Sequence, residues 1–211
     1  GESGAGKSTL IKIVTGLYRP DAGEVLFDGR PLRFRSYRDS LAQGIDVVSQ
    51  EIQVIPESTI AENIMLDKLV TRGRTGIIDW PAVNRVARPY LDRVGLPLPP
   101  DTIIKRLSAA HKQLVQIAKA LAAEARVLLL DEPTSSLTEH EARNLFGLLR
   151  GLRDKGATII FVSHKFEEVF ALCDKVSVLR DGRLVGTRPA AGLTRDELVT
   201  MMIGRDVTQA H

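Results

Sequence analysis

The sequence predicts an α/β fold with a mainly parallel sheet and an inserted α-helical subdomain. Patterns of helix and strand alternate along most of the chain, as in folds built from strand–helix–strand units. Two apolar runs, residues 127–131 and 158–164, have the length of buried strands. Between residues 56 and 124 the strand patterns give way to helical ones. We therefore expect one domain, in which helices interrupt an α/β core.

The first part of the core combines a helix with strands. Leu10, Val14 and Leu17 recur at helical spacing and predict one apolar face. An Asp-Gly pair ends the next apolar run, which is typical of a tight hairpin turn. Gln50 directly follows the last strand of this part, and the core is expected to take in residues 1–55. The expected elements are a helix over 7–17, a strand over 23–29 and a strand over 45–49.

Helix-start signals dominate the middle of the chain, residues 56–124. Thr59 is followed three residues later by Glu62, which is the pattern of a capping box. Asp79 precedes a second helical pattern that has a proline in its first turn, another helix-start signature. Pro89 lies inside that pattern and is expected to kink or end the helix. This stretch is therefore predicted to be the helical subdomain.

The last helix of the middle stretch is the strongest. Residues 108–125 have apolar side chains at helical spacing, and residues 95–101 before them form a rigid proline-rich connector. The apolar face comprises Leu114, Ile117, Ala118 and Leu121.

Strand and helix patterns alternate again in the rest of the chain. The second part of the core is expected over residues 125–190, followed by a C-terminal tail over 191–211. Thr194 is predicted to cap the last helix. The expected elements are buried strands over 127–131 and 158–164, helices over 139–156 and 165–174, a hairpin over 175–187 and a helix over 194–204.

The composition is that of an ordinary globular domain. Apolar residues make up 44% of the chain and charged residues 26%, with a net charge of +3. The basic residues are spread along the chain, and clusters such as Arg33, Arg35 and Arg38 are expected to be solvated, so no nucleic-acid partner is predicted. The single cysteine, Cys173, excludes an internal disulfide and is expected to pack in the core.

Residues 1–8, GESGAGKS, match the phosphate-binding loop pattern G-x-x-x-x-G-K-[ST]. Backbone N–H groups of such a loop surround phosphate oxygens, and the helix that follows presents its positive end to them. A glycine-rich turn is the alternative, but the helix directly after it favours a phosphate site and a P-loop NTPase (RecA-like) core. The residues expected to bind ATP here are Gly1, Gly4, Ala5, Gly6, Lys7, Ser8 and Thr9.

Two carboxylates end the buried strand over 127–131. In P-loop enzymes an Asp at this place holds magnesium, which here predicts Asp131, together with the Ser8 hydroxyl. Glu132 is then placed to activate the attacking water as a general base. An acidic pair at a strand end can also be a simple helix cap. The phosphate loop in the same chain favours the catalytic interpretation, with ATP and Mg²⁺ as cofactors.

Three further features stand in a fixed order. Gln50 ends a strand, residues 106–113 (RLSAAHKQ) open a helix, and His164 ends the strand TIIFVSH. Together with the loop and the acidic pair, they resemble the ATP-binding subunit of an ABC (ATP-binding cassette) protein over essentially the whole chain. The resemblance implies that GESGAGKST is the Walker A motif and VLLLDEPTSSLT the Walker B motif and D-loop.

The resemblance also implies roles for the remaining residues. Gln50 would be a nucleotide and magnesium ligand, and His164 a catalytic switch residue that senses the γ-phosphate. Ser108 and Ala110 would belong to the signature, which in this family meets the nucleotide of an opposite cassette. The second cassette is therefore an expected partner, in the same polypeptide or as a dimer.

Details resemble one subgroup, the bacterial importers of ribose, galactose, xylose and similar sugars. SQEIQVIPESTIAENIML, HKQLVQIAKAL and SHKFEEVFALCDKVSVLRDGRLVGT are similar to it, and MMIGRDV resembles the end of a first cassette. This implies ATP hydrolysis that drives sugar import, membrane permease subunits as partners, and a periplasmic sugar-binding protein as an indirect partner. The implied location is peripheral, at the cytoplasmic face of the inner (cell) membrane. The sequence does not name the sugar.

The sequence departs from the family pattern at two places, and each leads to an expectation. Ala110 stands where the signature usually has its second glycine, and a methyl group is tolerated there only if φ is negative. The chain also begins at the loop, whereas the family places strands and an adenine-stacking aromatic before it. We expect a chain truncated in this way to bind ATP weakly or not at all.

Other classes remain open. A soluble cassette protein that acts on ribosomes or DNA would share the ATP chemistry, but the basic insertions or coiled-coil arms expected of it are not seen in the sequence. A GTPase switch is a third class, for which an N-K-x-D guanine-binding motif is expected and not found. An inactive truncated fragment is a fourth.

Overall fold

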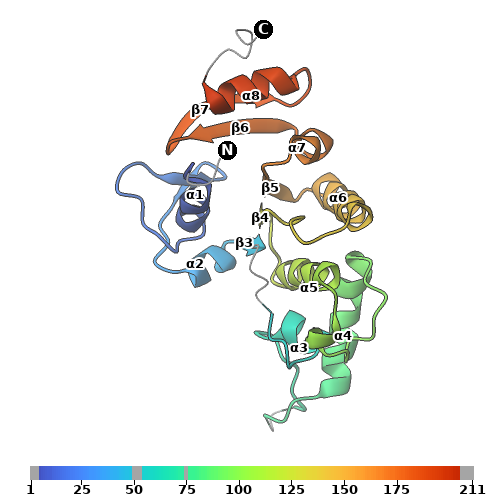
Figure 1. Ribbon diagram of the computed structural model, residues 1–211. Helices are drawn as coiled ribbons and strands as arrows, with labels where there is room; N and C mark the ends of the chain where they lie inside the picture. The colour runs from blue at the N-terminus through green and yellow to red at the C-terminus, as the bar shows by residue number, and fades with distance from the viewer. Residues whose placement is uncertain (1–4, 49–53, 74–75, 205–211) are drawn as a thin grey trace. The chain divides into compact units, whose positions relative to one another are not determined.

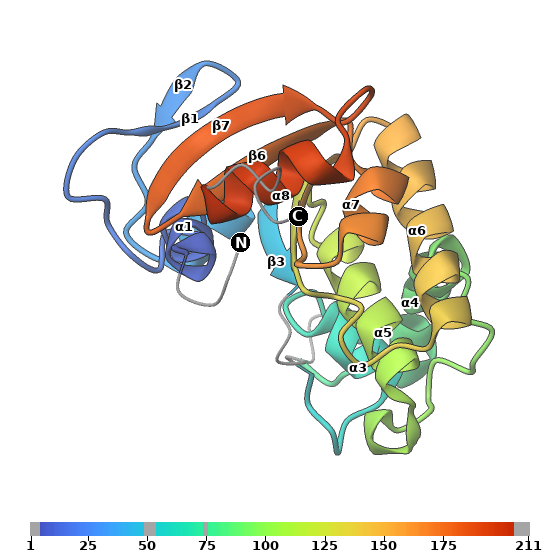
Figure 2. The same cartoon turned by 45° about the horizontal axis from the view of Figure 1, so that its top comes forward.

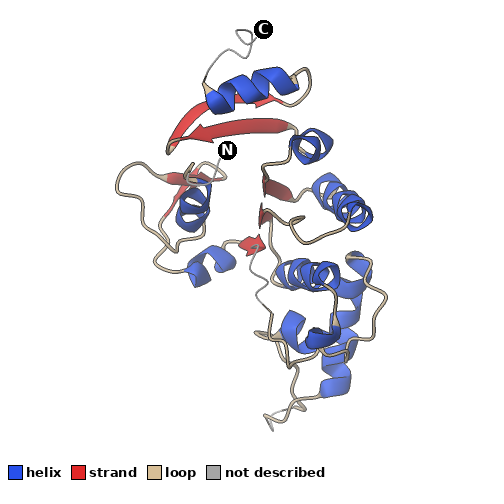
Figure 3. Cartoon of the chain, viewed as in Figure 1, coloured by secondary structure: helices blue, strands red, loops and turns tan. Residues whose placement is uncertain are grey.

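The computed structural model describes residues 5–48, 54–73 and 76–204 (Figure 1). The chain divides into two compact units, each described by itself. One consists of Gly1–Ala42 with Phe161–His211, and the other of Gln43–Ile160. Figure 3 shows the helices and strands of the chain, and the named elements between β3 and β4 are all helical, as the sequence predicts.

The first unit combines helices with two antiparallel hairpins. Its helices are α1 (Lys7–Val14), α2 (Tyr37–Ala42), α7 (Phe166–Leu172) and α8 (Arg195–Ile203). Its hairpins are β1 (Val25–Phe27) with β2 (Arg30–Leu32), and β6 (Lys175–Arg180) with β7 (Arg183–Pro189).

Both hairpins turn at an Asp-Gly pair, as predicted. Asp28 and Gly29 have φ values of 50° and 74°, and Asp181 and Gly182 have 51° and 72°. Positive φ at both central residues defines a type I′ turn, whose twist matches that of the flanking strands. Glycine at the second place removes the clash that a side chain would suffer there.

The second unit holds the three-stranded sheet and the remaining helices. Its strands are β3 (Ile45–Val48), β4 (Val127–Asp131) and the first part of β5 (Thr158–Val162), in the order β3-β4-β5. Its helices are α3 (Ile60–Met65), α4 (Trp80–Arg93), the 3₁₀ turn η1 (Ile104–Arg106), α5 (Ala109–Ala122) and α6 (Glu139–Asp154).

The predicted parallel pairing is confirmed. β3 runs parallel to β4, with Ile45 opposite Val127 and Val48 opposite Leu130. The long helical connection between the two strands allows this, because parallel neighbours need a crossover. The core of the sheet is the run Leu128, Leu129 and Leu130, each no more than 1% exposed.

The helices α3, α4 and α5 contact one another and form an apolar cluster (Figure 2). Thr59 and Glu62 form the predicted capping box at α3, and Asp79 accepts a hydrogen bond from the Ala82 N–H over 3.1 Å at the start of α4. The side chains that fill the cluster are fully buried: Ile60, Val83, Leu91, Ile104 and Ile117.

Pro89 is predicted to kink or end its helix. It does not end it. α4 runs on to Arg93 with Pro89 inside it. Both Pro89 and Arg85, whose carbonyl the proline cannot bond, are exposed to solvent. Water can therefore replace the missing hydrogen bond, which lowers the cost of the proline.

The prediction of which face of the first helix is buried is wrong. α1 ends at Val14, where the Thr15 hydroxyl donates to the Ile11 carbonyl over 2.8 Å. Leu17 therefore lies beyond the helix and is 55% exposed, and Leu10 is 49% exposed. Ile11 is the buried residue of α1 instead.

Two further elements differ from expectation. The strand β5 is predicted to be buried, but Ile160 is 39% exposed. Its burial alternates along the strand, so only one face is covered within the described residues. The short helix α2 was not predicted, because no apolar periodicity marks its six residues.

Candidate nucleotide-binding site

The start of α1 forms the described end of the phosphate-binding loop. Gly6 occupies the cap position with φ 95° and ψ 3°, and no side chain caps the helix there. The first turn contains no acidic residue. A helix start without a capping side chain among the described residues, together with the positive end of the helix dipole, favours an anion. Ser8 and Thr9 are exposed at this end, and Lys7 is half-buried.

The turn between β6 and β7 supports the same loop. The Gly182 N–H donates to the Ala5 carbonyl over 3.2 Å, and Ala5 is buried. A Cβ atom at Gly6 would stand 3.3 Å from the Gly182 Cα. The backbones of the loop and of the turn therefore approach closely where both residues are glycine. Gly1, Gly4 and Gln50 lie outside the described residues.

The acidic pair lies where the sequence predicts, at the end of β4. Asp131 is the last residue of the strand, and Glu132 follows with φ 47°. A left-handed conformation is uncommon for glutamate and costs about 1–3 kcal/mol. The Glu132 carbonyl accepts from the Ser135 N–H over 3.2 Å, which closes the turn.

The predicted signature residues lie at the start of α5. Ser108 is the cap, and its hydroxyl accepts a hydrogen bond from the His111 N–H over 3.2 Å. One N–H of this helix start is therefore bound by the cap. Ala110 lies within α5 and is not among the residues with positive φ, so the backbone accepts its methyl group.

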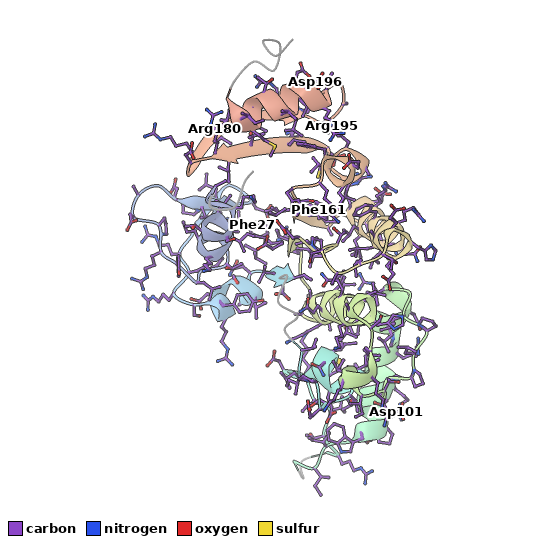
Figure 4. The ribbon with its side chains drawn as sticks, viewed as in Figure 1. Phe27, Asp101, Phe161, Arg180, Arg195 and Asp196 are labelled. Carbon is purple, nitrogen blue, oxygen red and sulfur yellow. The ribbon has the colours of Figure 1, made fainter. Side chains whose placement is uncertain are left out.

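His164 follows β5 and is exposed (Phe161 of the same strand is labelled in Figure 4). Its neighbour Ser163 donates from Oγ to Glu168 Oε2 over 2.7 Å. Sequence reasoning missed Ser163 and Glu168, because their spacing does not match the regular capping box. Cys173, at the end of α7, is partly buried, and burial raises the pKa of its thiol, in agreement with the expected packing role.

The predicted residues are divided between the two units. Ala5 to Thr9 and His164 belong to the first, and Ser108, Ala110, Asp131 and Glu132 to the second. Within the described residues no group of three or more His, Cys, Asp or Glu side chains could hold a metal ion alone. Mg²⁺ does not need one, because it binds few protein oxygens and completes its shell with phosphates and water. None of the helices in the described part of the chain has the length and apolar character needed to cross a membrane.

The chain is similar to several sugar-import proteins. It is 48% identical over 209 residues to "Ribose import ATP-binding protein RbsA 1" of Rubrobacter xylanophilus, which covers 99% of this chain and 41% of the relative. It is 49% identical over 208 residues to the ribose import ATP-binding protein RbsA of Chromobacterium violaceum, with 98% and 41% covered. The chain thus spans about two-fifths of the length of these curated relatives.

Solved structures agree on the fold. CbiO1 of Clostridium perfringens, described as part of the ABC transporter complex cbiONQ, superposes with a TM-score of 0.76 at 27% identity and covers 94% of this chain and 79% of its own. A nucleotide-free ATP-binding cassette from an ABC transporter superposes with a TM-score of 0.81 at 22% identity, covering 99% and 84%. The predicted P-loop NTPase fold is confirmed by these likenesses.

A family model decides the assignment. The model described as "ABC transporter" matches residues 1–135, which is more than half of the chain. That span contains the phosphate loop, the residues around Ser108 and Ala110, and the acidic pair. The chain therefore belongs to the ABC transporter family.

Proposed function

We propose that this chain binds and hydrolyses ATP and thereby powers import of a sugar through a membrane permease. The observation that carries the ATP part is the helix start at Gly6, which no side chain caps and which has no acidic residue in its first turn. The names of the relatives, which are ribose import ATP-binding proteins, support the sugar part.

The predicted residues divide the chemistry among them. Lys7 neutralises charge on the β- and γ-phosphates beside the backbone N–H groups of the loop. Glu132 takes the proton of the attacking water, and its turn conformation holds the carboxylate at the end of a buried strand. His164 and Gln50 sense the γ-phosphate. These residues would supply the charges and dipoles that a phosphoryl transfer needs.

Mg²⁺ fits the donors that the chain offers. The Ser8 hydroxyl, the Asp131 carboxylate and the Gln50 side-chain carbonyl are hard oxygen ligands, the kind that this ion prefers. These three residues would hold it, and the bound ion would neutralise charge on the phosphate oxygens.

The partners follow from the same proposal. Residues 56–124 form a helical subdomain that contacts the permease, and residues 1–55 and 125–190 form the core, with 191–211 as a tail. Ser108 and Ala110 meet the nucleotide of a second cassette, in the same polypeptide or in a dimer. A periplasmic binding protein delivers the sugar, and the chain works at the cytoplasmic face of the membrane.

Two assays test the proposal on the full-length gene product. Competition binding should show that ATP displaces a fluorescent nucleotide at far lower concentration than GTP does. Proteoliposomes that contain the permease and the full-length gene product should take up labelled ribose only when ATP is supplied on the side of the membrane where the ATP-binding chain lies. Preference for GTP would contradict the nucleotide assignment. Sedimentation with ribosomes and no association with a permease would favour the non-transport class.

A further inference from the structure

The two neighbours of His164 in the chain are tied to one carboxylate. Ser163 Oγ donates to Glu168 Oε2 over 2.7 Å and accepts from the Lys165 backbone N–H over 3.0 Å. Lys165 also places Nζ 3.1 Å from Glu168 Oε1. His164 is therefore the middle residue of a turn whose two sides meet at Glu168.

Glu168 is unlike the other carboxylates of the helix starts, because it is buried. Its side chain is only 9% exposed, whereas that of its partner Lys165 is 44% exposed. A buried carboxylate is costly unless hydrogen bonds and an opposite charge compensate it. Here a hydroxyl and an ammonium group do so. Loss of the carboxylate would therefore release both sides of the turn.

Three other helices of this chain begin with a regular capping box. At α3, α6 and α8 a threonine caps the helix, and a glutamate three residues later bonds back to the backbone N–H of that threonine. These are regular capping boxes, which join the two residues directly. The caps are Thr59, Thr138 and Thr194, and the glutamates are Glu62, Glu141 and Glu197.

The start of α7 differs from these three boxes. Its cap is Lys165, which makes no side-chain cap bond, and its third residue is Glu168. The carboxylate reaches the hydroxyl of Ser163 instead, and that hydroxyl accepts the Lys165 N–H. The Ser163 hydroxyl thus links the Glu168 carboxylate to the Lys165 N–H, and the turn that this link closes contains His164.

The first turn of α7 also contacts α8. The Arg195 guanidinium of α8 lies 5.4 Å from the centre of the Phe166 ring and 3.6 Å from Glu167 Oε1 (Figure 4 labels Arg195). Both groups of this ion pair are mostly exposed, 66% and 75%, so water screens it and the part-buried Ser163–Glu168 bond is the main constraint on the first turn. A rigid first turn can orient the residue that precedes it.

We propose that Glu168 is a positioning residue for His164 and that it acts through Ser163 and Lys165. The inference rests on the proposed function, in which His164 senses the γ-phosphate. Glu168 itself does not touch the nucleotide. Its carboxylate holds the turn, so that the imidazole is already oriented when ATP arrives and little ordering is needed at the moment of reaction.

The test compares ATPase rates of the full-length gene product assembled with its partner subunits. Glu168→Gln removes the charge and keeps the shape, and Ser163→Ala removes the relay without touching the buried carboxylate. Both should lower kcat by roughly tenfold to a hundredfold, as small misplacements of catalytic groups do, with little change in the KM for ATP. Glu167→Gln is the matched control, because Glu167 is exposed and bonds only towards α8 in the described contacts, and it should leave kcat unchanged.

A double-mutant cycle separates positioning from mere stability. If Glu168 acts through His164, adding Glu168→Gln to His164→Ala should lower kcat no further than His164→Ala alone. Melting temperatures of all variants are recorded, and a stabilising ligand or lower temperature keeps each one folded during the assay. Full additivity in the cycle, or a kcat for Glu168→Gln equal to that of the unaltered protein, would overturn the inference. An unchanged rate for His164→Ala alone would instead overturn the role of His164 in the proposed function, and the inference with it.

Discussion

The Gly182 N–H donates a hydrogen bond to the Ala5 carbonyl over 3.2 Å and so joins the phosphate loop to the β6–β7 turn. The two segments lie far apart in the sequence and within the same unit. Gly6, the next residue, has φ 95° and approaches the Gly182 Cα so closely that an added Cβ would lie at 3.3 Å. The phosphate loop is therefore supported by a turn whose residues lie outside its sequence motif.

Gly6→Ala should weaken ATP binding more than it weakens the fold. Alanine at this φ costs about 1–3 kcal/mol, and its methyl group also presses on the Gly182 backbone. The loop must then shift away from the position that surrounds the phosphates. Calorimetric titration with ATP and thermal unfolding measure the two effects separately.

Gly23→Ala is the matched control for that change. Gly23 has φ 79°, but nothing lies within 4 Å of an added Cβ. It should lower the melting temperature by a similar amount and leave ATP binding intact. Equal ATP affinities for both variants would refute the idea that the approach to Gly182 matters.

Glu132→Gln should leave ATP binding intact and slow hydrolysis. The amide cannot take a proton from water, and a general base typically contributes about 10²–10⁴-fold to the rate. Steady-state phosphate release on the full-length gene product measures the loss. Glu124→Gln controls for the backbone, because Glu124 also has positive φ, at 61°, and is an exposed glutamate. If turnover by Glu132→Gln is unchanged, Glu132 is not the base.

Asn63→Ala should destabilise the helical region. Asn63 is 2% exposed, and its amide accepts from the Ile55 N–H over 2.7 Å and donates to the Ile55 and Thr59 carbonyls over 3.2 and 2.9 Å. Removing it leaves backbone groups unpaired, at a cost of about 1–3 kcal/mol. Urea unfolding measures the loss. Asn144→Ala, at an exposed site whose amide bonds only His140 in the described contacts, should change stability by less than about 0.5 kcal/mol.

The capping box of α8 should make stability depend on pH. Hydrogen bonds from the Thr194 N–H and hydroxyl lower the pKa of Glu197 below its usual 4.5. Because the folded-state pKa is lower than the unfolded one, the charge stabilises the fold above the unfolded pKa. That contribution is lost as pH falls through the folded pKa.

Glu197→Gln tests this with urea unfolding at two pH values. The variant should be less stable than the unaltered protein near neutral pH, and the difference should shrink well below 4.5. Asp196→Asn is the control, because Asp196 lies in the same turn but is not part of the capping box. It measures the effect of losing a negative charge near the positive end of the helix dipole. A difference for Glu197→Gln that does not change with pH would show that the charge is not what stabilises the turn.

The sequence by itself determined the features whose cause lies within a few residues. The capping box at Thr59, the cap at Thr194, the Asp-Gly turns and the parallel buried strand ending in Asp131 all agree with the structure. Their hydrogen bonds and steric limits involve near neighbours, so a pattern of residue types predicts them. The phosphate-loop pattern and the order of the motifs likewise sufficed for the family, which the comparisons confirm.

Only the tertiary structure decided which faces are buried and which distant groups meet. Leu10 and Leu17 have the spacing of a core face, yet Ile11 is buried, because the end of α1 at Val14 and the surrounding packing select the face. The link of Ala5 to Gly182 joins residues far apart in the chain, and the relay from Glu168 through Ser163 has a spacing that no regular cap uses. Such contacts form only when the whole unit folds, because their partners are set by packing rather than by local spacing.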